Sequence, residues 1–232
     1  MKNTNLFIAF IAFEGLDGSG KTTQSRMLHR YFESKNIESI LIFDPGTTDL
    51  GNKIREIVKS PITMNPLAEA YLFAAARSQL VQEVTAPALK QGKTVVCDRF
   101  FHSSLAYQTV GGLSKNIVEE INKYSVGLMP HITFFINTSA KESIARKGRI
   151  EEKSDRFEKK DMTFHKKVHE AYKKMSLPGG FMYSSLSYEA AVEHKMMIEI
   201  NGHDSPENIH KDIVTHVEKY YESEKLSTQL ML

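Results

Sequence analysis

A glycine-rich segment near the start of the chain carries the residues whose chemistry is easiest to interpret. Residues 15–22 read Gly-Leu-Asp-Gly-Ser-Gly-Lys-Thr and fit the pattern G-x-x-x-x-G-K-S/T. A continuous apolar run, residues 6–13, precedes the pattern, and a segment with helical spacing, residues 22–34, follows it. A buried strand before the loop and a helix after it are the context that makes this pattern specific for a phosphate-binding loop.

Each residue type in this loop suits the binding of a triphosphate. Glycines let backbone N–H groups curl around phosphate oxygens, and the following helix points its positive N-terminus at the anion. Lys21 would reach the β- and γ-phosphates, and the Thr22 hydroxyl would be a ligand of Mg²⁺. We therefore predict that ATP binds at Gly15, Asp17, Gly18, Ser19, Gly20, Lys21, Thr22 and Thr23.

A second pair of candidate residues, Asp98 and Arg99, directly follows the apolar run 94–97. If that run is a strand of a parallel sheet, both side chains lie at its carboxyl end, where ligands bind in open α/β folds. An acidic group there can hold Mg²⁺ through water, and an arginine can bind a phosphate with two parallel hydrogen bonds. We predict Thr22 and Asp98 as metal ligands and Lys21, Asp98 and Arg99 as catalytic residues, although a capping Asp and a surface Arg can also end a strand.

The remaining pattern indicates the elements that hold these residues in place. Continuous apolar runs, typical of strands buried on both faces, cover residues 6–13, 39–43, 94–97, 132–136 and 196–200. Segments with helical spacing lie between them, at residues 22–34, 50–59, 66–90, 115–124, 140–147 and 157–175, with a last one that begins at Pro206. The alternation predicts an α/β fold in which a five-stranded parallel sheet has helices on both faces.

Length and composition exclude several classes of protein. A chain of 232 residues suits a single domain, and a net charge of only +2 argues against a nucleic-acid-binding protein. Its first apolar run is too short to span a bilayer, so we expect no membrane association. The single cysteine, Cys97, excludes an intramolecular disulfide and fits a reducing compartment such as the cytoplasm. The sequence also argues against a GTPase, because the chain contains no Asn-Lys-x-Asp guanine-reading sequence.

Five segments, in this order, resemble the thymidylate kinases, and most closely their bacterial branch. They are residues 13–24; 44–48 with 50–51 and 54–55; 72–77; 98–100 with 103–104 and 106–108; and Arg149 with 155–158. The resemblance spans almost the whole chain. It implies a P-loop NTPase three-layer α/β/α sandwich with a mobile lid at about residues 148–157. It also implies transfer of the γ-phosphate of ATP to dTMP, with Mg²⁺ as cofactor and dTDP as product.

The resemblance assigns two residues to the thymine base. Phe73 would stack on the ring, and Arg77 would donate a hydrogen bond to its exocyclic oxygen. The two residues are four apart, so they share one face of the helix expected at residues 66–90. A donor aimed at the 4-position prefers the carbonyl of thymine over the amino group of cytosine.

Other acceptor-binding roles follow from the same resemblance. Arg99 and Arg55 match the family's contacts to the dTMP phosphate, and Asp17 matches the carboxylate that accepts the 3′-hydroxyl. Tyr107 matches the aromatic residue beneath the sugar, where a 2′-hydroxyl would collide or lie unpaired. The resemblance brings three further residues near the acceptor: Ser104 and Gln108 at the base edge, and Asp44, which stands where bacterial relatives usually have Glu.

The charged stretch at residues 148–155 corresponds to the lid, which closes over the triphosphate and excludes water. Gly18 stands where one branch of the family carries an arginine, so a lid arginine must stabilise the transferring phosphoryl group. Arg149 is our first choice for this catalytic role, and Arg146 and Arg156 are the alternatives. We assign no role to residues 177–195.

Two other functions stay open at this point. The acceptor can be another nucleoside monophosphate or a nucleoside, or the chain can be a regulatory nucleotide-binding module without turnover. A nucleotide-binding module without turnover needs neither an arginine for the acceptor phosphate nor a lid arginine, so the sequence favours a kinase. The resemblance also implies a homodimer packed through long helices.

Overall fold

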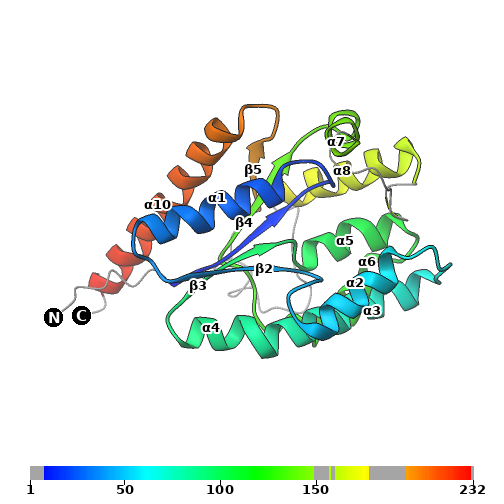
Figure 1. Ribbon diagram of the computed structural model, residues 1–232, viewed down its shortest axis with the longest axis horizontal. Helices are drawn as coiled ribbons and strands as arrows, with labels where there is room; N and C mark the ends of the chain where they lie inside the picture. The colour runs from blue at the N-terminus through cyan, green and yellow to red at the C-terminus, as the bar shows by residue number, and fades with distance from the viewer. Residues whose placement is uncertain (1–7, 149–156, 158–159, 178–196, 231–232) are drawn as a thin grey trace.

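A parallel five-stranded sheet forms the centre of the computed structural model, which describes residues 8–148, 157, 160–177 and 197–230 (Figure 1). Its strands are β1 (Phe10–Glu14), β2 (Ser39–Phe43), β3 (Thr94–Asp98), β4 (Ile132–Asn137) and β5 (Met197–Asn201). They lie in the order β2-β3-β1-β4-β5, and every neighbouring pair is parallel. The α/β fold predicted from the sequence is therefore confirmed.

Helices cover both faces of this sheet. They are α1 (Lys21–Ser34), α2 (Asp49–Lys59), α3 (Pro66–Leu80), α4 (Ala86–Lys90), α5 (Phe101–Val110), α6 (Lys115–Lys123), α7 (Ala140–Lys147), α8 (Met162–Ser176) and α10 (Pro206–Leu230), with a π-helical turn η1 (Val81–Thr85) between α3 and α4. Figure 1 shows α1 and α10 on one side of the sheet and α3 to α6 on the other. The arrangement is the three-layer sandwich expected of a P-loop NTPase.

Strand β1 shows why the sheet needs two helical layers. All five of its residues are buried, and successive side chains point to opposite faces. Ile11 and Phe13 pack in a cluster with residues of α1 and α10, whereas Phe10 and Ala12 pack in a second cluster with α4, α5 and α6. A strand with one polar face would leave one of these layers without a core, which explains the continuous apolar run in the sequence.

Helix α5 is the element that the sequence analysis missed. Seven of its ten residues are buried, including the polar His102, Ser104 and Gln108. A helix that is buried nearly all round carries no apolar stripe, so its sequence lacks the helical spacing that revealed the other helices. The same helix supplies four residues that line the cavity described below: Ser103, Ser104, Tyr107 and Gln108.

Two other predicted helices differ in detail. The segment predicted as one helix over residues 66–90 is helical throughout, but η1 interrupts it just before Pro87, whose missing N–H cannot continue the regular ladder. Helix α8 begins at Met162 rather than at residue 157, because Asp161 caps it by accepting a hydrogen bond from the N–H of Phe164 at 2.7 Å. The predicted lid and residues 178–195 lie largely or wholly outside the described residues.

In the described part of the chain, no helix combines the length and the apolar character that crossing a bilayer requires.

Candidate active site

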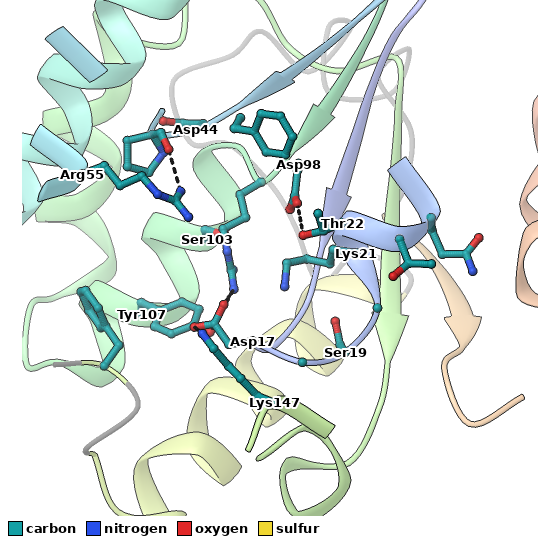
Figure 2. A pocket seen from close by; sticks show the side chains of 18 of the residues that line it. Asp17, Ser19, Lys21, Thr22, Asp44, Arg55, Asp98, Ser103, Tyr107 and Lys147 are labelled. Atoms are coloured by element: carbon teal, nitrogen blue, oxygen red, sulfur yellow. Dashed lines mark hydrogen bonds and ion pairs between the residues drawn. The ribbon is translucent and has the colours of Figure 1, made fainter. Parts of the chain in front are cut away.

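The carboxyl ends of β1, β2 and β3 face a cavity of about 970 Å³. The phosphate-binding loop and the start of α1 form one wall, and residues of α2, α3 and α5 form another (Figure 2). Within the described residues, every site residue predicted from the sequence lines this cavity except Gly15. Arg149 and the alternative Arg156 lie outside the described residues.

The loop has the backbone that its glycines allow. Gly15, Gly18 and Gly20 have φ angles of 139°, 80° and 108°, which L-residues with a side chain rarely adopt. At Gly18 a Cβ atom would also lie 2.1 Å from the carbonyl oxygen of Ser143. A side chain at this position would therefore push the loop away from α7. Gly20 is the N-cap residue of α1 and provides no side-chain cap, so the first N–H groups of the helix stay available to an anion.

Lys21 is buried at the centre of this loop. Its Nζ donates a hydrogen bond to the carbonyl oxygen of Leu16 at 2.6 Å. Burial and, to a smaller extent, the charge of Arg99 lower the pKa of Lys21, and nearby carboxylates oppose them, so that the pKa is about 8. The ammonium group therefore lies in a cation-rich site that favours the arrival of negative charge.

Thr22 and Asp98 meet between the start of α1 and the end of β3. The Thr22 hydroxyl donates to Oδ2 of Asp98 at 2.5 Å, and Figure 2 shows the two side chains pointing toward each other above Lys21. Both groups offer hard oxygen ligands of the kind that Mg²⁺ prefers, and both line the cavity. The two predicted metal ligands thus fit a magnesium ion that is held by few protein atoms and by phosphate oxygens.

Arg99 connects the end of β3 to the phosphate-binding loop. Its φ angle is 71°, and its Nη2 donates to Oδ1 of Asp17 at 2.6 Å. Burial alone would raise the pKa of Asp17, but Arg99, Lys21 and Lys147 outweigh that effect and lower the pKa well below its usual range. Asp17 is therefore an ionised carboxylate surrounded by cations, a suitable acceptor for a sugar hydroxyl.

A buried network behind Arg99 was not predicted as part of the site. Nη1 of Arg99 donates to the hydroxyls of Ser103 at 2.9 Å and Tyr172 at 3.3 Å. Both hydroxyls also contact Oε2 of Glu14, at 2.6 Å for Ser103 and 2.9 Å for Tyr172. Burial raises the pKa of Glu14, although Arg99 and these hydrogen bonds oppose the shift. In the sequence, Glu14 at the end of an apolar strand was a signal that could have indicated this network.

Phe73, Tyr107 and Phe157 form an aromatic wall in the cavity. The ring centroid of Phe157 lies 6.1 Å from that of Phe73 and 6.1 Å from that of Tyr107. Arg99 also stacks on the Tyr107 ring, with Cζ 5.2 Å from its centroid. The rings provide flat apolar surface of the size of a base and a sugar. Phe157 belongs to a segment that carries the family resemblance, but the sequence analysis predicted no role for it.

Arg77 lines the cavity from the same helix as Phe73 but is almost fully buried, with 1% of its surface exposed. Its Nε donates to Oδ2 of Asp44 at 2.6 Å, and its Nη1 donates to Oδ1 of Asn122. Burial raises the pKa of Asp44, whereas Arg77 opposes the shift. Asp44, predicted as a substrate contact, therefore also pairs with the predicted base-reading arginine.

The other predicted acceptor residues surround this wall. Nη1 of Arg55 donates to the carbonyl oxygen of Pro45 at 2.8 Å, and Nε2 of Gln108 donates to Oε1 of Glu69 at 3.0 Å. Ser104 is buried in α5 and lines the cavity. The first of these contacts fixes Arg55 against the loop that follows β2, so its guanidinium points into the cavity from α2 (Figure 2).

Two cations at the end of α7 approach the phosphate-binding loop. Nζ of Lys147 lies 3.9 Å from Oδ2 of Asp17. Arg146 also lines the cavity, and its Nη2 donates to Oε1 of Glu142 at 2.5 Å. Lys147 was not singled out from the sequence, because a lysine at the end of a helix is common on surfaces.

The fold and this site define a P-loop phosphotransferase: the phosphate cradle and the aromatic wall share one cavity, and Arg99 contacts both Asp17 of the cradle and Tyr107 of the wall. Comparison with known proteins gives the family. A family model described as thymidylate kinase matches residues 13–213. The chain belongs to the thymidylate kinase family.

Individual relatives support this membership. A protein named thymidylate kinase from Thermoanaerobacter sp. strain X514 is 35% identical over 216 residues, which cover 91% of this chain and 98% of that protein. One with the same name from Kosmotoga olearia is 38% identical and covers 88% of this chain and 93% of its own length. A third, from Dehalococcoides mccartyi, is 41% identical over 167 residues, or 70% of this chain and 80% of that protein.

Proposed function

We propose that this chain transfers the γ-phosphate of ATP to dTMP and forms dTDP and ADP by direct in-line transfer. Family membership supports the overall reaction. The observation that supports this reaction at this site is the shared cavity. The phosphate cradle lies on one side of it, and the aromatic wall with Arg77 lies on the other. In one shared cavity the donor and acceptor phosphates can meet without a covalent enzyme intermediate.

Magnesium is part of the proposal. Thr22 and Asp98 would hold the ion, which supplies charge neutralisation to the triphosphate when bound. Lys21 and the N–H groups of the loop would bind the β- and γ-phosphates. Their cationic surroundings are already in place, since Arg99, Lys21 and Lys147 all act on Asp17.

Acceptor binding follows from the opposite wall. Arg99 and Arg55 would bind the dTMP phosphate, and Asp17 would accept the 3′-hydroxyl. The Tyr107 ring would lie beneath the sugar, and Phe73 and Arg77 would hold the base. Because Arg99 also contacts Asp17, the acceptor phosphate would arrive with its attacking oxygen directed at the cradle.

A lid arginine would stabilise the negative charge of the transferring phosphoryl group in the transition state. Arg149 remains our proposal for this role. Arg146, at the end of α7, is the candidate within the described residues, and it lines the cavity while bonded to Glu142. Replacing Arg149 with Ala should lower the rate about 1,000-fold with ATP binding retained, whereas near-normal transfer would move the role to another arginine.

A coupled ADP-release assay across dTMP, dUMP, dCMP, dGMP and thymidine tests the acceptor. We expect dTMP to have the highest kcat/KM, and a fixed donor in the base pocket, which favours a 4-carbonyl, to disfavour dCMP in particular. A different preferred acceptor would refute the roles proposed for Phe73 and Arg77. Release of ADP without any acceptor phosphorylation would indicate an ATPase or a binding module.

A homodimer is also proposed. Helices α2, α3 and α6 pack side by side (Figure 1) and expose large apolar side chains: Leu50, Ile57, Leu67, Tyr71, Ile117 and Tyr124. A second copy of the chain would cover this apolar face. Sedimentation equilibrium should give twice the chain mass, and Tyr71→Glu should shift it toward the monomer.

We also propose a cytoplasmic location, which the buried single thiol of Cys97 suits.

A further inference from the structure

Two side chains from different elements fix the guanidinium of Arg77. On one side Nε donates to Oδ2 of Asp44, which follows β2, at 2.6 Å. On the other side Nη1 donates to Oδ1 of Asn122 on α6. The face of the guanidinium packs on Phe100, with Cζ 5.6 Å from the ring centroid. Arg77, Asp44 and Asn122 are each at most 3% exposed, so water does not compete for these contacts.

This arrangement leaves one nitrogen for a ligand. Among the residues that the structure describes, none accepts a hydrogen bond from Nη2 of Arg77, although Arg77 lines the cavity. Guanidinium donors lie in a fixed planar fork. Holding Nε and Nη1 therefore also fixes the direction in which the Nη2 donors point.

Asn122 is itself held in one orientation. Its Nδ2 donates to the carbonyl oxygen of Val118, one turn earlier in α6, at 2.7 Å. That bond turns Oδ1 toward Arg77, and the hydroxyl of Ser125 also lies 3.4 Å from Oδ1. Asn122 thus offers Arg77 an acceptor oxygen that is held in place. None of the segments that carry the family resemblance contains Asn122.

We propose that Asn122 is a positioning residue for base selection: with Asp44 it fixes Arg77 so that Nη2 donates to the 4-carbonyl of the acceptor base. This inference rests on the proposed function, in which Arg77 contacts the base. A fixed donor rejects cytosine, because the 4-amino group would place donor against donor in a buried site. Without Asn122, the guanidinium of Arg77 can turn its Nη2 away from the 4-amino group of cytosine. The binding penalty against dCMP therefore decreases.

The test compares Asn122→Leu with a matched control, Asn116→Leu, which makes the same change at an exposed position of the same helix. Steady-state kinetics give kcat/KM for dTMP and dCMP and the KM for ATP. In Asn122→Leu we expect the dTMP-to-dCMP ratio of kcat/KM to fall about 10- to 100-fold, the size of effect that a misplaced binding group produces. The KM for dTMP should rise, while kcat at saturating dTMP and the KM for ATP should stay within about twofold. Asn116→Leu should match the wild type.

Asn122→Asp provides the rescue, because it keeps an acceptor oxygen for Nη1, and it should restore most of the dTMP-to-dCMP ratio. An unchanged dTMP-to-dCMP ratio in Asn122→Leu would overturn the inference. Equal loss of kcat/KM for dTMP and dCMP, with a matching rise in the KM for ATP, would also overturn it, because it indicates a general structural role. If Asn122→Leu fails to fold, Asn122→Ser, which is too short to reach Nη1, decides by the same ratio. A wild-type enzyme without preference for dTMP would instead refute the proposed function.

Discussion

The guanidinium of Arg99 and the carboxylate of Asp17 lie 2.6 Å apart and join the end of β3 to the phosphate-binding loop. Asp17 comes from the donor side of the cavity, whereas Arg99 is the proposed contact to the acceptor phosphate. The two halves of the site are therefore connected by a direct ion pair. A change at Arg99 must alter the loop as well as the acceptor pocket.

Arg99→Lys tests this connection. Lysine keeps the charge but loses the planar fork that reaches Asp17, Ser103 and Tyr172 together. Each hydrogen bond to a charged group contributes about 1.5–3 kcal/mol, so we expect kcat/KM for dTMP to fall about 10- to 100-fold. Coupled-assay kinetics measure the change. A matched control is Arg30→Lys in α1, which should leave the kinetics unchanged, and equal effects in both variants would contradict a special role for the fork.

Thr22 provides a second prediction, about magnesium. Thr22→Val keeps the shape of the side chain but removes the hydroxyl that bonds to Asp98, whereas Thr22→Ser keeps the hydroxyl. We expect Thr22→Val to lower kcat about 100-fold or more and to raise the Mg²⁺ concentration needed for half-maximal rate, since metal binding contributes several kcal/mol of charge stabilisation. Thr22→Ser should remain close to the wild type.

Magnesium titrations of both Thr22 variants, after chelation by EDTA, measure this effect. The wild type should lose transfer completely on chelation and regain it when Mg²⁺ is added back. Transfer that persists in EDTA would refute the magnesium proposal. An equal loss in Thr22→Ser and Thr22→Val would show that packing, rather than the hydroxyl, is what the position requires.

The sequence predicted the fold well, because its strongest signals are local. Continuous apolar runs indicate buried strands, and the loop at residues 15–22 fits one known pattern with a strand before it and a helix after it. Helix α5 escaped prediction because it is buried nearly all round, so its residues carry no periodic contrast. The start of α8 was set by a single capping residue, Asp161, within a charged stretch.

Contacts between distant residues account for what the sequence could not predict in the site. Glu14 and Tyr172 are 158 positions apart, and Arg77 and Asn122 are 45 apart, so no spacing rule connects them. Each of these residues also has an ordinary interpretation by itself: the end of a strand, a core tyrosine or a polar helix residue. Only the fold shows that buried polar groups meet there and satisfy one another.

Tyr172 gives a third prediction. Its hydroxyl, on α8, contacts Glu14, Ser103 and Arg99 in a fully buried position. Tyr172→Phe keeps the ring but deprives Glu14 of one donor, which should cost about 1–3 kcal/mol of unfolding free energy. The KM for dTMP should also rise several-fold, because Arg99 loses a partner that holds its guanidinium.

The matched control for this variant is Tyr31→Phe. The hydroxyl of Tyr31 also bonds to a glutamate, Oε1 of Glu218 at 2.7 Å, but it lies on the surface away from the cavity. The free energy of unfolding of Tyr31→Phe, measured with denaturant, should lie within about 0.5 kcal/mol of the wild-type value, and its KM for dTMP should not change. Equal losses of stability in both variants would show that burial of the Tyr172 hydroxyl has no special effect.

Lys21 gives a prediction about pH. Its folded-state pKa is lowered to about 8 from 10.5, so in the unliganded protein the ammonium loses its proton as the pH rises through 8. Only the charged form attracts phosphate. Since kcat/KM reports the free enzyme, we expect kcat/KM for ATP to fall about tenfold per pH unit above that value. Bound ATP adds negative charge and raises the pKa of Lys21, so the fall in kcat should occur at higher pH than the fall in kcat/KM.

The same shift affects stability with a definite sign. Between pH 8 and 10.5 the unfolded chain holds the proton of residue 21 while the folded protein has released it. Folding therefore becomes easier as the pH rises through that window, and the cost of burying Lys21 is fully present below pH 8. Lys21→Arg keeps its charge throughout, so its kcat/KM for ATP, although lower, should not fall between pH 8 and 10. A fall near pH 8 in both proteins would assign the titration to another group.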